Sequence, residues 1–146
     1  MTSVLPTGGL PIGRTGRTLL TLCGAVLLAG FGLARQIEPD PRGYGTHQRL
    51  GLPGCAFQML YRRPCPGCGM TTSLVHFARG EWSAAMRANP AGVLLALSCL
   101  GLIPWCWWSA WRGRLWAVDE PWPVLAVLVG SWGAVGLLIW MLRWLA

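Results

Sequence analysis

The sequence carries little charge for its 146 residues. Only 12% of the residues are charged, against roughly a quarter in ordinary soluble domains. Five residues are acidic, and lysine is absent because all twelve basic residues are arginine. With 53% hydrophobic residues and a positive mean hydropathy, this composition excludes an ordinary soluble domain and indicates a membrane protein.

The features of a nucleic-acid-binding protein are also missing. The formal net charge is +7, but no basic stripe with interleaved aromatic residues accompanies it. The arginines instead flank apolar runs, where anionic lipid headgroups attract them, and the ten tryptophans favour the same boundary. We therefore expect the lipid bilayer as the main partner and no nucleic acid. A homo-oligomer or another membrane protein stays open as a further partner.

Three apolar runs are long enough to cross a bilayer. The first, 18–34, has seventeen uncharged residues, which is about the minimum for a hydrocarbon core of roughly 30 Å. The second, 90–111, follows the helix-start pair Asn89-Pro90, and the third covers 121–142. Residues 1–16 show no periodicity and predict a flexible tail, which leaves 17–146 as a single membrane domain.

The first run also allows a second interpretation. Arg14 and Arg17 precede an apolar stretch that ends in Gly-Leu-Ala, a pattern that also fits a cleaved signal peptide. Both a retained span and a cleaved leader therefore stay open for this run.

The segment between the first two spans, about 50–89, is too polar and too interrupted to cross the membrane. Residues 50–61 are mostly apolar but are broken by Pro53-Gly54, and Gly80 divides an amphipathic stretch into 71–79 and 81–88. Placing Arg79 or Arg87 at the bilayer centre would cost about 2.5–3.5 kcal/mol each. The sequence thus predicts an all-α membrane protein with three transmembrane helices and a short re-entrant or interfacial helix pair.

Six cysteines divide into two groups. Three lie inside apolar runs, where a small buried hydrophobe is the simplest interpretation: Cys23, Cys99 and Cys106. The other three lie in the polar middle region and are the candidates for chemistry: Cys55, Cys65 and Cys68.

Cys65 and Cys68 form a C-x-x-C pair within residues 64–72, a segment that we call the knuckle. This spacing lets two sulfurs reach one metal ion, or each other in a disulfide. Gly67 and Gly69 supply positive φ or close backbone passage, and a helix is expected to begin near Met70. The start of that helix would favour the thiolate form of Cys68.

A zinc knuckle is our first hypothesis for this pair. A structural zinc site needs four ligands, which Cys55 and either His76 or His47 could complete. Alternatively, two subunits could each contribute a cysteine pair. His76 also has a simpler interpretation, as a polar residue on the exposed face of an amphipathic helix.

Two alternatives remain beside zinc, and only the first of them is an enzyme. In thiol–disulfide exchange, Cys65 would attack a disulfide and Cys68 would resolve it, although no thioredoxin-like βαβ pattern is present. In a purely structural role, the knuckle shapes a turn in an assembly subunit, and Thr71, Thr72 and Asn89 cap helices. A covalent c-type haem is disfavoured, since Gly69 stands where that motif needs histidine.

Several separately spaced elements resemble one known family. These are Cys65-Pro66-x-Cys68-Gly69-Met70-Thr71, then Gly80, then Arg87-x-Asn89-Pro90 before an apolar helix. The pattern resembles the bacterial membrane-protein family catalogued as domain of unknown function 2752, although Thr72 replaces the arginine of many members. The resemblance implies a small helical protein of the bacterial inner membrane, with no established activity and no assigned cofactor. It also implies that a set of motif residues has a structural role: Pro66, Gly69, Thr71, Gly80, Arg87, Asn89 and Pro90.

Overall fold

The computed structural model describes residues 9–63 and 65–145. In these residues the regular secondary structure is helical, apart from one isolated bridge between Pro11 and Arg114, and this confirms the predicted all-α class. The elements are α1 (Arg14–Gln36), the 3₁₀ helix η1 (Thr46–Leu50), α2 (Ala56–Tyr61), α3 (Met70–Ala78), α4 (Trp82–Ala88), α5 (Pro90–Arg112) and α6 (Pro121–Leu145).

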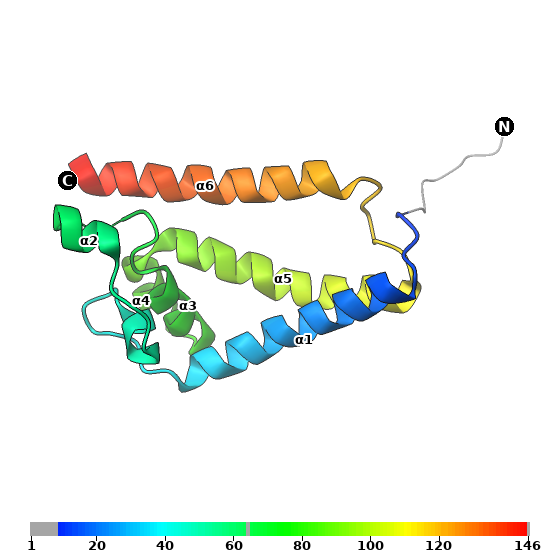
Figure 1. The fold of residues 1–146 in the computed structure, drawn as a ribbon, viewed down its shortest axis with the longest axis horizontal. Helices are drawn as coiled ribbons and strands as arrows, with labels where there is room; N and C mark the ends of the chain where they lie inside the picture. The colour runs from blue at the N-terminus through cyan, green and yellow to red at the C-terminus, as the bar shows by residue number, and fades with distance from the viewer. Residues whose placement is uncertain (1–8, 64, 146) are drawn as a thin grey trace.

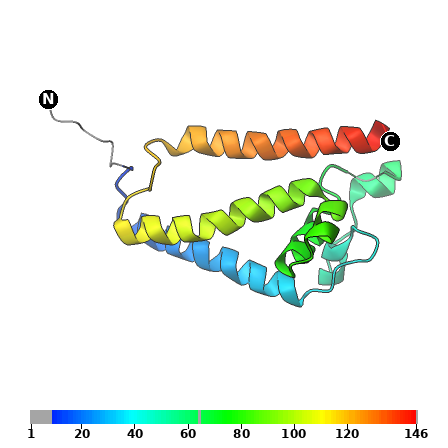
Figure 2. The ribbon, with the colours of Figure 1, turned by 180° about the vertical axis from the view of Figure 1, so that it is seen from behind.

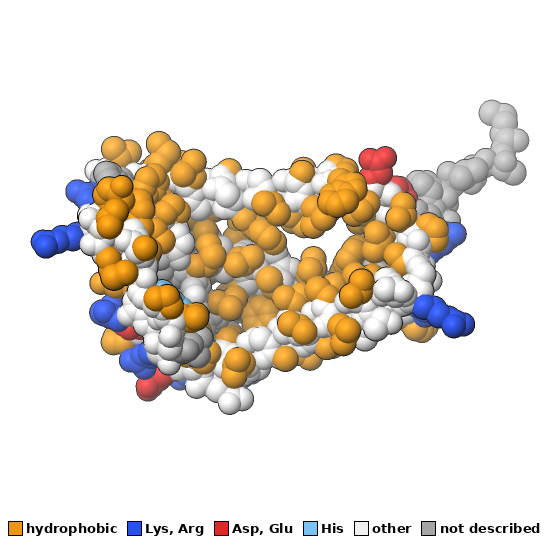
Figure 3. Space-filling model, in the orientation of Figure 1, with side chains coloured by type: hydrophobic (Ala, Val, Ile, Leu, Met, Phe, Trp, Pro, Cys, Tyr) orange, Lys and Arg blue, Asp and Glu red, His pale blue; other side chains and the backbone are white. Residues whose placement is uncertain are grey.

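Three of these helices are long and apolar enough to cross a membrane. They are α1, α5 and α6, whose apolar segments have 23, 23 and 22 residues. The three predicted spans are therefore confirmed. In Figure 1 they run alongside one another, while the four short helices gather where α1 ends and α5 begins. Figure 3 shows arginine side chains at the two ends of the molecule and hydrophobic side chains between them. This distribution is the one expected for a protein set across a bilayer.

The first helix begins earlier than the sequence predicts. α1 starts at Arg14, inside the expected tail 1–16, and the residues just before it are hydrogen-bonded to the turn after α5. Leu10 N–H donates to the Val118 carbonyl over 3.2 Å, and Ile12 N–H donates to the Gly113 carbonyl over 2.9 Å. This pairing orders the approach to α1. Residues 1–8 of the expected tail lie outside the described residues.

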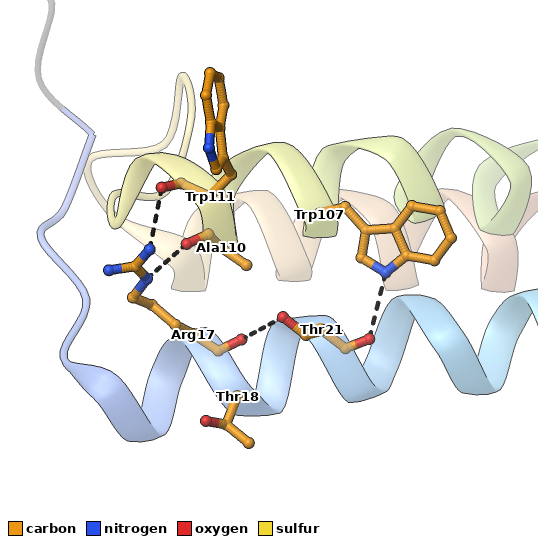
Figure 4. A pocket seen from close by; sticks show the side chains of 6 residues that line it. All are labelled: Arg17, Thr18, Thr21, Trp107, Ala110 and Trp111. Atoms are coloured by element: carbon orange, nitrogen blue, oxygen red, sulfur yellow. Dashed lines mark hydrogen bonds between the residues drawn. The ribbon is translucent and has the colours of Figure 1, made fainter.

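α1 and α5 diverge toward the knuckle, where α3 lies between them, and lie against each other at the end far from it (Figures 1 and 2). There the Arg17 side chain donates to the carbonyls of Ala110 and Trp111, over 2.7 and 3.2 Å, and Trp107 Nε1–H donates to the Thr21 carbonyl over 3.3 Å (Figure 4). Arg17 thereby satisfies carbonyls that the last turn of α5 leaves without an intrahelical partner.

The opposite end of this helix pair contains the buried core. Phe77 of α3, Ala85 of α4 and Val93 and Ala96 of α5 form one cluster, and Phe31 of α1 packs against it. α3 and α4 are the predicted helix pair, separated at Gly80, whose φ of +82° favours glycine. The pair therefore packs on the bundle, and its core is made with the first turns of α5.

α6 lies along α5 but apart from α1, as the two opposite views in Figures 1 and 2 agree. Trp132 of α6 donates its indole N–H to the Ser98 hydroxyl of α5 over 3.2 Å. Near the knuckle, Trp140 of α6 meets Phe57 of α2 edge-on, with ring centroids 6.2 Å apart. α6 thus reaches the end of the molecule that carries the knuckle.

Candidate metal centre

The knuckle is a tight turn that puts both of its sulfurs on one side. Cys68 N–H donates to the Cys65 carbonyl over 3.0 Å, and Met70 N–H donates to the Gly67 carbonyl over 3.1 Å. As a result, Cys65 Sγ lies 3.2 Å from Cys68 Sγ. α3 begins at Met70, directly after this turn, as the sequence predicts.

Cys55 joins the pair from ten residues earlier in the chain. It is the residue before α2, and the turn between α2 and the knuckle brings its side chain back to the C-x-x-C pair. The three sulfurs all lie within 4.8 Å of one another, with Cys55 and Cys65 half-buried and Cys68 buried. We call Cys55, Cys65 and Cys68 the cysteine cluster.

The three thiols differ in their tendency to ionise. A hydrogen bond from the Gln58 backbone N–H, in the first turn of α2, lowers the pKa of Cys55. Burial raises the pKa of Cys68 to about 12, and its neighbours Cys65 and Cys55 contribute in the same direction. The expectation that the start of α3 favours a Cys68 thiolate is therefore wrong, because burial disfavours the charged sulfur.

Asn89 holds the knuckle to the start of α5. Its side-chain oxygen accepts the Ala91 N–H over 3.0 Å, which confirms the predicted helix cap, and Pro90 occupies the first turn. Its side-chain nitrogen donates to the carbonyls of Cys68 and Pro66, over 3.1 and 3.3 Å. One buried amide thus joins the two halves of the motif, C-P-x-C-G and R-x-N-P.

Gly69 stands where three segments come together. Its φ is +86°, and a Cβ atom placed there would lie 2.6 Å from the Ala88 carbonyl oxygen and 2.8 Å from that of Gly43. Both neighbours are backbone atoms, so any side chain would push α4 or the loop away from the knuckle. Close passage at Gly69 is confirmed, whereas Gly67 has no positive φ.

The threonines of the knuckle do not cap α3. No side-chain hydrogen bond caps this helix, so the capping role predicted for Thr71 and Thr72 is wrong. Instead, the hydroxyl of the buried Thr72 lies 2.8 Å from that of Thr46, which also accepts the Asp40 N–H over 3.0 Å. Thr72 therefore attaches the start of η1 to α3, a role that its position next to Thr71 did not reveal.

The histidines lie outside the cysteine cluster. His76 Nδ1 is 2.5 Å from a carboxylate oxygen of Glu81, across the turn between α3 and α4, and Arg79 also contacts this carboxylate. His47 lies half-buried in η1. In the described part of the chain, the group of side chains close enough to share a metal ion is Cys55, Cys65 and Cys68.

Comparisons with known proteins bear on the same segment. No curated protein and no solved structure matches the chain. The family model described as Protein of unknown function (DUF2752) matches residues 55–103, from Cys55 through the knuckle and the helix pair into α5, and it confirms that this segment resembles that family.

Proposed function

We propose that the cysteine cluster binds one zinc ion and that this ion holds the knuckle against α2. The observation that supports the proposal is the convergence of three sulfurs, from two segments ten residues apart, within 4.8 Å of one another. Sulfurs that share a tetrahedral zinc ion lie about 3.8 Å apart, given zinc–sulfur bonds of about 2.3 Å. The cluster needs only small side-chain rotations to reach that spacing.

Zinc suits this set of donors better than the harder divalent cations do. Thiolates are soft ligands that favour zinc, whereas magnesium and calcium favour oxygen. The described chain offers three sulfurs, which leaves the fourth position to water or to a ligand from elsewhere. His76 is not among the described side chains close enough to share that ion, although its Nδ1 contact with Glu81 leaves Nε2 free.

A structural role for the ion agrees with the small size of the segments that it would join. α2 has six residues, and the structure shows an exposed apolar surface on it, including Met59 and Leu60. A helix of this length does not persist by itself, because nucleation is costly. Zinc would join α2 to the knuckle, and Asn89 joins the knuckle to α5.

Metal analysis of purified protein tests this proposal directly. Protein prepared with a reductant and without a chelator should carry about one zinc ion per chain. Cys65→Ser combined with Cys68→Ser should remove the zinc, whereas Cys99→Ser, a cysteine of α5 outside the cluster, should leave it unchanged. A wild-type preparation without stoichiometric metal would exclude the zinc centre.

Thiol–disulfide exchange is the second candidate, supported by the 3.2 Å separation of Cys65 Sγ and Cys68 Sγ. The Cys65 thiolate would attack a partner disulfide and release one partner thiolate. Cys68 would then attack the mixed disulfide, so that the pair is oxidised and the partner is reduced by two electrons. Cys68→Ser should trap the mixed disulfide, and the candidate fails if neither single variant traps one.

A further inference from the structure

A cavity of about 410 Å³ lies beside the cysteine cluster and is bordered by positive charge. Three arginines from three segments line it: Arg42 from the loop after α1, Arg62 from the end of α2 and Arg87 from α4. The other lining residues are uncharged or belong to the cluster: Gly43, Tyr44, Gln58, Cys68 and Ala88. No aspartate or glutamate is among these lining residues.

Two of these three charges lack an acidic partner. Arg42 is oriented by Asp40, with Nε and Nη2 donating to the carboxylate over 3.0 and 2.7 Å. Arg62 and Arg87 form no ion pair with any acidic residue that the structure describes. Like charges that border one cavity repel one another, and the field between them attracts an anion.

The backbone at Arg62 adds a second, independent observation. Arg62 ends α2 with a φ of +52°, in the left-handed region that favours glycine and asparagine. A non-glycine residue in this conformation is strained, and such strain is found at binding sites. The conformation places an arginine at the rim of the cavity, in a position that glycine would normally occupy.

We propose that Arg42, Arg62 and Arg87 bind a phosphate group in this cavity. Arg62 and Arg87 can each donate two parallel hydrogen bonds to phosphate oxygens, whereas Arg42, whose Nε and Nη2 donate to Asp40, keeps Nη1 as a further donor. The Tyr44 hydroxyl and the Gln58 amide supply further donors. The site lies at the end of the spanning helices that carries the short helices, where a bilayer would place its headgroups, so the phosphate belongs either to a phospholipid or to a small soluble phosphate compound.

Native mass spectrometry of the detergent-purified full chain tests this proposal with two probes, short-chain phosphatidylglycerol and inorganic phosphate. Wild-type protein should bind one equivalent of at least one probe in a saturable manner. Arg62→Gln combined with Arg87→Gln should weaken that binding at least about tenfold, the factor expected from losing charge-assisted hydrogen bonds. Binding of the lipid alone identifies a headgroup, and binding of inorganic phosphate alone identifies a soluble phosphate compound.

The control variant removes the same charge elsewhere. Arg35→Gln combined with Arg114→Gln lies outside the cavity and should bind as wild type does. Equal binding by the two double variants, or no stoichiometric binding of either probe to wild type, overturns the proposal. The zinc content of every preparation is measured, so that loss of metal is not mistaken for loss of the anion. If the double variant does not fold, Arg87→Gln alone gives the same comparison, because this exposed side chain has no acidic partner among the residues that the structure describes.

Discussion

At the scale of single residues, Asn89 contributes most to the geometry of the knuckle. Its oxygen caps α5 and its nitrogen binds two carbonyls of the knuckle, so one side chain serves two purposes. Capping alone is worth about 1 kcal/mol, and a hydrogen bond to a buried carbonyl adds a similar amount. We therefore expect Asn89→Ala to destabilise the protein by roughly 2–3 kcal/mol.

Asn89→Ser separates the two purposes. A serine oxygen can still cap α5, but it cannot reach both knuckle carbonyls. Thermal unfolding should therefore place Asn89→Ser between wild type and Asn89→Ala. Transfer of zinc to a chelator should be faster than wild type in both variants. Zinc transfer at the wild-type rate in Asn89→Ser would mean that the knuckle keeps its shape without these two bonds.

At the scale of helices, α3 packs on α5 with no space to spare at Gly92. A Cβ atom there would lie 2.7 Å from Ser73 Cβ and 3.0 Å from the Met70 carbonyl oxygen. Ser73 cannot turn away at low cost, because its hydroxyl contacts the carbonyls of Ala85 and Asn89 over 2.9 and 2.8 Å. Overpacking of this kind costs about 1–3 kcal/mol.

Gly92→Ala should therefore lower the unfolding temperature, and Gly101→Ala supplies the matched control. Gly101 lies on the same helix, and a Cβ atom there would meet nothing within 4 Å. Alanine at such a site gains about 0.5–1 kcal/mol from helix propensity. The two substitutions should shift the unfolding temperature in opposite directions. A rise for both would show that α3 does not lie as close to α5 as described.

The sequence predicted the long helices well because their signal is local. Neighbouring residues alone define an uncharged run bounded by arginine, and they also define an Asn-Pro helix start. α5 begins at Pro90, where the pair Asn89-Pro90 predicts it. The contacts of the site depend on distant residues. The Thr46–Thr72 bond joins positions 26 residues apart, and the pKa of Cys68 depends on burial that spacing does not encode. The pairing of Cys55 with the knuckle was the one tertiary contact that short separation made predictable.

At the scale of the whole molecule, arginine is unevenly divided between the two ends. Four arginines belong to the end with the start of α1 and the α5–α6 turn: Arg14, Arg17, Arg112 and Arg114. The segments at the end with the cysteine cluster carry the other eight: Arg35, Arg42, Arg49, Arg62, Arg63, Arg79, Arg87 and Arg143. Arginine-rich flanks stay in the cytoplasm, so we expect the cysteine cluster to face that side. Thiols there are kept reduced, which favours metal binding over a disulfide.

Labelling of intact cells with a membrane-impermeant maleimide tests this orientation. A variant that keeps only Cys65 and Cys68 should be labelled only after the cells are permeabilised. Asp119→Cys in a cysteine-free chain reports on the α5–α6 turn, without changing the arginines, and should be labelled at once. The reverse pattern would place the cluster outside, where the 3.2 Å pair could close to a disulfide. Thiol exchange would then replace zinc as the first explanation, because an oxidised pair has no thiolates to offer a metal ion.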